Sequence, residues 1–256
     1  MVFYLDKSSH EFDKNYVFKI PPNFNFTHDI IDEWSRWEDK LAIIFKDNKN
    51  HLSQCVRYNE LAGGAFFFSE VENDIGFQKG DIIYVIGEVN YHWTCIVIEL
   101  IRRGIVFCPI SSAITQGAII NGVNLINPKS ILLTEDVDFN YDLIMQKCPT
   151  IKNIYKLNHR EKIIRLKRQS NFQINENIRP YIPRNTMMIE FYLNKNNSLK
   201  YEVRDNTSLL EKSILTNTDY KSPSAIMLED GNYKSVNWKC MFYKFIIGAL
   251  VNIKLR

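Results

Sequence analysis

The feature that most constrains the fold is a regular alternation of short apolar runs and amphipathic segments between residues 82 and 157. The apolar runs are predicted strands and lie at residues 82–86, 105–110, 130–134 and 153–157. The segments between them are predicted helices, at residues 91–103, 115–127 and 139–148. Strands that are apolar along their whole length are typical of a parallel sheet buried on both faces. The pattern therefore predicts an α/β fold, with a doubly wound, mostly parallel sheet and helices on both faces.

Further elements are predicted on either side of this region. Thr27 is the expected N-cap of a first helix, and residues 41–45 and 55–58 are expected to form a hairpin. Asn59 is the expected N-cap of the next helix. Towards the C-terminus, strands are predicted at residues 187–192 and 225–228, and a helix at about residues 236–248.

The polar and basic stretch 158–183 ends in Arg-Pro-Tyr-Ile-Pro and is the predicted linker between two subdomains. The expected organisation is an N-terminal extension at 1–22, a first α/β subdomain at 23–183, and the start of a second, truncated subdomain at 184–256. Within the linker, residues 159–168 are interpreted as a solvated helix face. Contact of this basic segment with nucleic acid or a membrane surface is the alternative.

Composition excludes several classes of protein. The chain has 32 basic and 29 acidic residues, so its net charge of +3 indicates no nucleic-acid partner. The five cysteines are scattered and show no CxxC spacing, which is typical of reduced thiols in an intracellular protein. HExxH, GxSxG and GxGxxG are absent from the sequence. These motifs would mark a metal site, a nucleophile or a dinucleotide site, so we predict no metal ligand and assign no catalytic residue.

The N-terminal residues, MVFYLDKSSHEFDK, contain acids and no uninterrupted apolar segment. A secretory signal or an acid-poor transit peptide is therefore not predicted. The apolar run 242–250 is interrupted by Lys244 and is too short to span a bilayer. The default expectation is a cytoplasmic protein without a membrane span.

Three strings of residues carry a resemblance to a known family. They are FNFTHDIIDEW at residues 24–34, FQKGDIIYV at residues 77–85, and LIRRGIVFCP at residues 100–109. In this order they resemble the medium-chain acyl-CoA synthetases of the AMP-dependent, adenylate-forming superfamily. A further match covers residues 230–249, so that the resemblance extends from about residue 23 to residue 249.

The resemblance implies both a fold and a reaction. The fold would be the incomplete N-terminal domain of an adenylate-forming enzyme. Members of the family use ATP and magnesium to activate a medium-chain carboxylic acid as an acyl-adenylate, and then transfer the acyl group to coenzyme A. The family also provides an alternative cellular address, the mitochondrial matrix.

The family holds the ATP phosphates in a loop of the form TSGTTGxPK that directly follows a strand. In this chain the corresponding segment is LNKNNSLK, residues 193–200, which lacks both glycines and the proline. The resemblance gives five candidates for a degenerate phosphate loop, with Ser198 and Lys200 the best donors: Asn194, Asn196, Asn197, Ser198 and Lys200. The loss of glycine where φ must be positive favours a solvated loop that binds nothing. A weak anion nest is the alternative.

Three other residues are relevant to the comparison with the family. Two of them correspond to a segment near its acyl pocket, and the third differs in residue type from the family at its position. Asp230 and Tyr233 correspond to a segment near the acyl tunnel, although Tyr233 is also interpreted as an ordinary core aromatic. Glu99 lies within the apolar helix 91–103, where the family has a small apolar residue. We interpret Glu99 as a solvent-facing residue or a sign of a relaxed core, with a functional carboxylate as the alternative.

The family's adenine, ribose, metal and C-terminal catalytic motifs correspond to positions beyond Arg256, so the sequence predicts an acyl-CoA synthetase-like protein that is catalytically impaired as this chain. Two alternatives remain open, a pseudoenzyme that acts as a binding or dimerisation module and a truncated gene product. An apolar face left exposed predicts self-association.

Overall fold

The structure is a computed structural model. It describes residues 23–36, 41–47, 52–134, 137–157, 163–169, 186–194, 198–206 and 226–230. Four of the predicted features lie outside these residues: the extension 1–22, Asn196 with Asn197, Tyr233, and the helix at 236–248. The chain divides into two compact units, Gly64–Asp205 and a second unit made of Met1–Gly63 and Asn206–Arg256.

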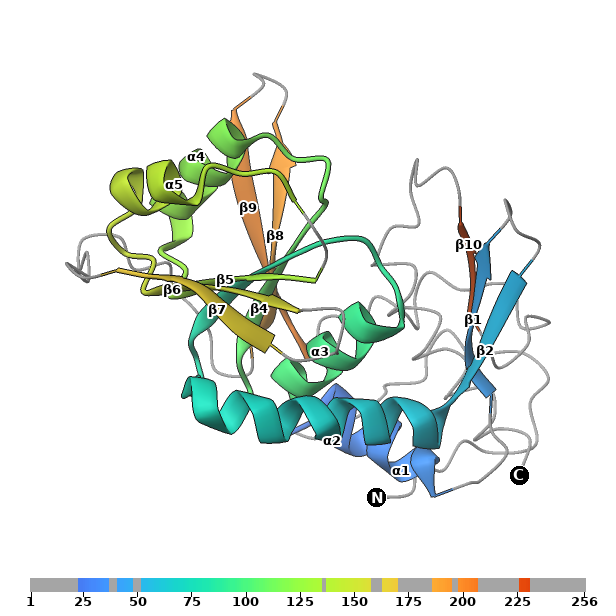
Figure 1. The fold of residues 1–256 in the computed structure, drawn as a ribbon. Helices are drawn as coiled ribbons and strands as arrows, with labels where there is room; N and C mark the ends of the chain where they lie inside the picture. Colours follow the sequence, from blue (N-terminus) through green and yellow to red (C-terminus); the bar gives the residue numbers. More distant parts are fainter. Residues whose placement is uncertain are drawn as a thin grey trace, which may run out of the picture. The chain divides into compact units, whose positions relative to one another are not determined.

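The unit Gly64–Asp205 is built on a seven-stranded sheet with the order β7-β6-β5-β3-β4-β8-β9 (Figure 1). Its strands are β3 (Ile82–Ile86), β4 (Val106–Ile110), β5 (Ser130–Leu133), β6 (Asn153–Leu157), β7 (Ile163–Arg168), β8 (Thr186–Leu193) and β9 (Leu199–Asp205). The five inner strands are parallel, whereas β7 and β9 pair antiparallel at the two edges. The predicted α/β fold with a mostly parallel sheet is confirmed.

Helices cover both faces of this sheet. They are α2 (Tyr58–Ile75), α3 (Tyr91–Arg102), α4 (Gln116–Ile126) and α5 (Tyr141–Lys147). The ring of Trp93 on α3 meets Phe107 of β4 edge-on, with 6.3 Å between ring centroids. On the opposite face, α4 and α5 pack in one apolar cluster with Tyr84 of β3. Alternate residues of each strand thus pack into two apolar cores, one on each face of the sheet. This explains why the strands are apolar along their whole length.

Short polar side chains mark the helix ends. The N-cap side chains of Asn90, Thr115 and Asn140 each accept a hydrogen bond from the backbone three residues later. Asn127 ends α4 with φ at 52°. In a chain with only 10 glycines, an asparagine thus takes the left-handed position at the end of this helix.

Glu99 is buried in α3, with 1% of its surface exposed. Its carboxylate forms an ion pair with the Arg102 guanidinium one helical turn later. The expectation of a solvent-facing Glu99 is therefore wrong. The charge is tolerated because the partner lies at i+3 on the same helix face, where the two side chains can meet.

The other unit contains a three-stranded sheet of β10 (Ile226–Asp230), β1 (Leu41–Asp47) and β2 (Leu52–Arg57). Strands β1 and β2 form the predicted antiparallel hairpin, and β10 pairs parallel to β1. The first helix consists of η1 (Thr27–Asp32), a segment of π type, and α1 (Glu33–Ser35). The helix predicted after residue 58 is also present, although it begins at Tyr58, before the expected cap Asn59.

Asn25, rather than the predicted Thr27, caps the first helix. Its side-chain oxygen accepts from the backbone N–H groups of Thr27 and His28, and its own N–H donates to Asp29. Phe24 and Phe26 on either side are buried. The string at residues 24–29 thus combines two apolar anchors with a reciprocal cap.

Two further expectations differ from the structure. Strands β8 and β9 belong to the same sheet as β3 to β7, so the compact units divide at Gly63 and Asp205 rather than near residue 183. Residues 163–168 form the strand β7, and the predicted helix face is wrong for this part of segment 159–168. A β-bulge in β7 conceals the alternation that would have identified a strand.

Candidate functional site

The strand order of the unit Gly64–Asp205 reverses at β3. The chain passes from β3 to β4 on one side and then crosses to β5 on the other side of β3. In open α/β sheets, ligands bind beyond the carboxyl ends of the strands at such a switch point. The residues that follow β3 and its neighbour β4 therefore define one part of the candidate site. The hairpin of β8 and β9 is included because it carries the predicted phosphate loop.

A carboxylate and two hydroxyl groups meet directly after β3 and β4. Glu88 accepts hydrogen bonds from the hydroxyls of Ser111 at 3.0 Å and Ser112 at 2.9 Å. The backbone N–H of Gly87 donates to the carbonyl of Ile110, which holds the two strand ends together. The carboxylate satisfies both hydroxyl donors, so an anion would have to displace it to bind them.

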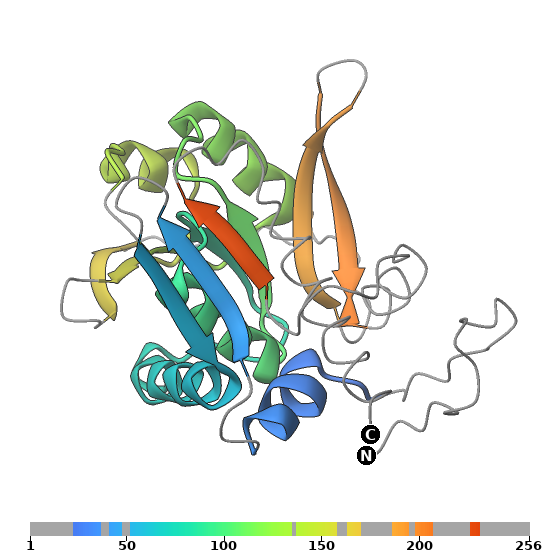
Figure 2. The same cartoon turned by 90° about the vertical axis from the view of Figure 1, so that its right-hand side faces the viewer.

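The candidate phosphate loop forms the tip of the hairpin between β8 and β9, seen as the long twisted pair in Figure 2. The N–H of Asn194 donates to the carbonyl of Ser198 at 3.0 Å, and the N–H of Ser198 donates to the side-chain oxygen of Asn194 at 2.9 Å. The structure thus joins two of the five candidate residues to each other. The Ser198 amide, which a phosphate would use, already has a partner.

Lys200 lies on β9 directly opposite Tyr192 of β8. Both side chains are exposed, and 49% of the Tyr192 surface is accessible. Within the described residues, Lys200 forms no ion pair with a carboxylate. In the part of the chain that the structure describes, Lys200 is therefore an exposed cation without a carboxylate partner, two residues beyond Ser198.

These residues do not fit a triphosphate cradle of the family's kind. Such a cradle needs converging backbone N–H groups, which glycines provide. Here the loop sequence has no glycine and the Ser198 amide donates to Asn194. The described part of the chain also contains no cluster of three or more histidine, cysteine, aspartate or glutamate side chains able to hold a metal ion.

The predicted acyl-pocket residues belong to the other unit. Asp230 is the last residue of β10 and pairs with Asp47 of β1. Tyr233 lies outside the described residues, so the predicted position of both residues near an acyl pocket stays a prediction.

Sequence motifs gave no indication of Glu88, Ser111 and Ser112. Their signal was positional, because each lies within two residues of the end of a predicted buried strand near the switch point. In the described residues, no helix has both the length and the apolar character needed to cross a membrane.

No family model matches the chain. Among curated proteins, it is 28% identical to "Acyl-coenzyme A synthetase ACSM4, mitochondrial" of Mus musculus and 27% identical to the Homo sapiens protein of the same name. It is 21% identical to human "Acyl-coenzyme A synthetase ACSM2A, mitochondrial". Each alignment covers 140 residues, 52% of this chain and 24% of the relative. The matched stretch thus spans about a quarter of these relatives' length.

Two solved structures share the fold. CmiS6 matches with a TM-score of 0.62 and 12% identity over 88% of this chain and 50% of its own. IdnL1 matches with a TM-score of 0.56 and 11% identity over 87% of this chain and 42% of its own. The sequence matches confirm the resemblance on which the motif analysis rested: over about half of its length the chain is similar to acyl-coenzyme A synthetases.

Proposed function

We propose that this chain is an acyl-CoA synthetase-like protein that does not by itself activate a carboxylic acid with ATP. The observation that carries the proposal is the hydrogen bond from the Ser198 amide to the Asn194 side chain. A phosphate group at this hairpin would have to break that bond. Medium-chain acids, magnesium-ATP and coenzyme A are the substrates that relatedness to the family would imply.

The remaining contacts with a nucleotide would be weak. Ser198 could offer a hydroxyl and Lys200 a charge, but both are exposed, and exposed charge pairs contribute only about 0–1 kcal/mol. We propose Asp230 and Tyr233 as the residues nearest the acyl chain, because they correspond to the segment beside the family's acyl tunnel.

The test is ATP–pyrophosphate exchange in the presence of magnesium and octanoate, which reports formation of the acyl-adenylate without coenzyme A. We expect no exchange above the rate without protein. Fatty-acid-dependent exchange by the purified chain, abolished by Lys200→Gln and unaffected by Lys167→Gln, would contradict the proposal. Lys167 is the matched control because it lies on β7, away from the hairpin.

A second candidate function is self-association as a binding module, which the exposed aromatic residues of α2 favour. Phe66 is 62% exposed and Phe67 is 42% exposed, whereas the next residue, Phe68, is buried. Sedimentation velocity of the wild-type chain and of Phe66→Ser tests it. We expect the wild type to self-associate and the variant to do so less. A wild-type chain that stays monomeric at the highest soluble concentration would rule out this function.

The cellular address also remains a proposal. The N-terminal sequence led us to expect the cytoplasm, whereas the names of the relatives place those proteins in mitochondria. Fractionation of cells that express the full chain with a C-terminal tag separates the two addresses.

A further inference from the structure

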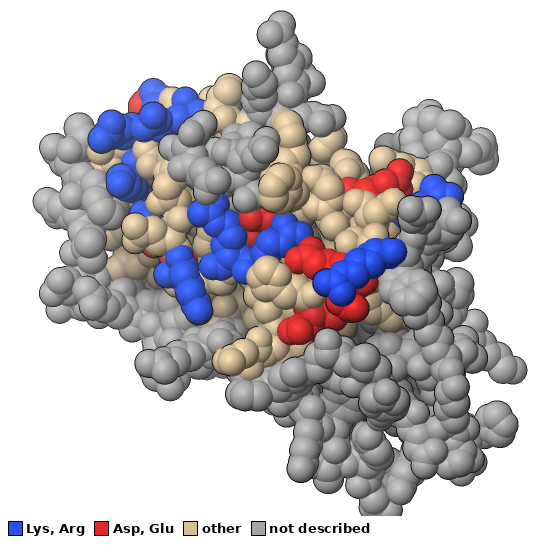
Figure 3. Space-filling model, turned by 90° about the horizontal axis from the view of Figure 1, so that it is seen from below, with Lys and Arg blue, Asp and Glu red and all other residues tan. Residues whose placement is uncertain are grey.

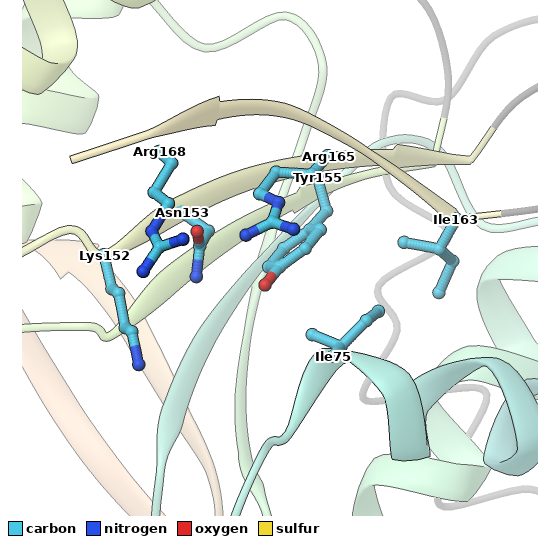
Figure 4. A pocket seen from close by; sticks show the side chains of 7 residues that line it. All are labelled: Ile75, Lys152, Asn153, Tyr155, Ile163, Arg165 and Arg168. Carbon is cyan, nitrogen blue, oxygen red and sulfur yellow. The ribbon is translucent and has the colours of Figure 1, made fainter. Parts of the chain in front are cut away.

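A basic cavity lies against β6 and β7, away from the candidate phosphate loop. Its volume is about 290 Å³, and its lining includes Lys152, Asn153, Tyr155, Arg165 and Arg168. In Figure 4 these side chains project from the two strands to one side, towards Ile75 at the end of α2. We refer to this space as the basic cavity.

A β-bulge places the two arginines on one face. Residues three apart in a regular strand point to opposite faces of the sheet. In β7, however, Arg168 pairs with Asn153 and Arg165 pairs with Tyr155, and the register shifts between these pairs. The bulge turns Leu166 to the apolar cluster beneath α5, and Lys167 to Asp142 of α5. Arg165 and Arg168 both reach the basic cavity as a result.

The cations of the basic cavity have no carboxylate partner in the part of the chain that the structure describes. They are Lys152, Arg165 and Arg168. Nearby lysines differ, because Lys129 pairs with Asp81 and Lys167 pairs with Asp142. The face of the molecule seen in Figure 3 likewise carries basic side chains at its centre, with acidic ones beside only part of them. The attraction for anions is thus local, because the whole chain carries a net charge of only +3.

Two buried polar side chains form the inner wall of the basic cavity. Asn153 is 5% exposed, and its side-chain oxygen has no hydrogen-bond partner. Tyr155 is 4% exposed and packs edge-on against Phe77. Burial raises the pKa of the Tyr155 phenol, and this outweighs the lowering by both arginines and by its hydrogen bond with Asn153. The phenol is therefore neutral at physiological pH. A buried amide oxygen without a partner costs free energy that a ligand N–H or O–H would recover.

We propose that the basic cavity binds a small organic phosphate. Its phosphate group meets Arg165 and Arg168, and an N–H or O–H donor on its organic part meets the side-chain oxygen of Asn153. Arginine suits this role because its planar guanidinium can donate two parallel hydrogen bonds to phosphate oxygens. A volume of about 290 Å³ suits a small molecule rather than a polymer.

The basic cavity is separate from the candidate phosphate loop. Asn153 is the first residue of β6, whereas Asn194 follows the last residue of β8. Because the inner strands are parallel, these residues lie at opposite ends of the sheet. A strand of five residues spans about 17 Å, so one ligand phosphate cannot contact both places. The proposal therefore does not depend on the proposed function.

Isothermal titration of the full chain with two probes, ADP and pyrophosphate, tests the assignment. We expect both to bind at one site, and ADP to bind more tightly because only ADP has an organic part whose N–H and O–H groups can reach Asn153 while its phosphates stay on the arginines. The double variant Arg165→Gln/Arg168→Gln should weaken ADP binding by at least about tenfold, since it removes two charged donors. Lys167→Gln on the same strand is the matched control and should bind like wild type.

Several results would overturn the assignment. These are binding of neither probe at millimolar concentration, a double variant within twofold of wild type, or loss of binding in Lys200→Gln, which would move the ligand to the hairpin. Equal affinity for the two probes would remove the role of Asn153. Circular dichroism checks that the double variant is folded. If it is not, Lys152→Gln serves instead, because this exposed residue precedes the strand, and its ADP affinity should fall while that of Lys167→Gln does not.

Discussion

The two ends of the seven-stranded sheet differ in how their polar groups are satisfied. At the carboxyl ends, Ser111 and Ser112 donate to Glu88, and the Ser198 amide donates to Asn194. At the amino end of β6, the arginines of the basic cavity lack carboxylate partners among the described residues, and the oxygen of Asn153 lacks a donor.

This difference shows that a domain can be similar in sequence to an enzyme family and yet lack open ligand-binding groups where that fold class usually binds its ligands. At the end where the fold class usually binds ligands, the donors bond to other groups of the protein. At the other end, the described residues include arginines without a carboxylate partner and an amide oxygen without a donor. Asparagine shows the contrast directly, because the Asn194 side-chain oxygen accepts from Ser198, whereas the Asn153 side-chain oxygen has no donor among the described residues. The following predictions test that contrast, from the largest expected effect to the smallest.

Removing a paired arginine should cost far more stability than removing an unpaired one. Arg102→Met leaves the buried Glu99 carboxylate without its partner, and we expect the free energy of unfolding to fall by about 3 kcal/mol. Arg165→Met is the matched comparison and should change it by less than about 0.5 kcal/mol. Urea denaturation followed by circular dichroism measures both. Similar losses in the two variants would contradict the contrast between satisfied and unsatisfied charge.

Ligand affinity at the basic cavity should rise between pH 5.5 and 7.5 and then stay level to pH 9. A terminal phosphate gains its second charge with a pKa of about 6, while arginine stays protonated throughout this range. Burial raises the pKa of Tyr155 above its ordinary value, so the phenol stays neutral over the same range. Titration of ADP at several pH values measures the effect, which we expect to approach tenfold. A fall between pH 7.5 and 9 would mean that Tyr155 loses its proton there.

Asn153→Leu should weaken ligand binding with little change in stability. The variant removes an amide oxygen without a partner, but it also removes the hydrogen bond with the Tyr155 phenol, so we expect the free energy of unfolding to change by less than about 1 kcal/mol. The affinity for ADP should fall to that for pyrophosphate. Thermal unfolding and titration of the same sample report the two effects. A loss of more than about 2 kcal/mol would show that the side-chain oxygen of Asn153 also has a structural partner.

Asn194→Ala should have the smallest effect. It removes one exposed hydrogen bond of the β8–β9 hairpin, so we expect a loss of about 0.5–1 kcal/mol in the free energy of unfolding. It also frees the Ser198 amide, but exchange activity should stay absent because the loop still lacks glycine. Exchange by this variant would show that the single hydrogen bond is what blocks the phosphate position.

Much of the fold followed from periodicity. The strands at 82–86 and 153–157 occur at the predicted residues, and the helix at 91–102 ends one residue early. These elements are long, apolar and buried, so that local pattern and tertiary packing favour the same structure. The first helix was placed correctly, but its cap was not, because Thr27 and Asn25 are equally suitable cap residues in the sequence.

The candidate sites were less predictable. The hairpin was recognised only through resemblance, and the bond between Asn194 and Ser198 depends on the turn geometry. The basic cavity was missed because Ile-Ile-Arg-Leu-Lys-Arg at 163–168 shows no period of two. A bulge changes which residues share a face, and it depends on the pairing of β7 with β6, which local sequence does not encode.

The bulge in β7 also has a consequence for solubility. In the described part of the chain, β7 is the outermost strand of its sheet and presents an unpaired backbone edge. Such edges can recruit strands from other molecules and lead to aggregation, and proteins counter this with charged side chains and irregular pairing. The arginines and the bulge of the basic cavity also oppose the addition of another strand to this edge. The same bulge therefore places both arginines at the proposed ligand site and reduces the tendency of the sheet to aggregate.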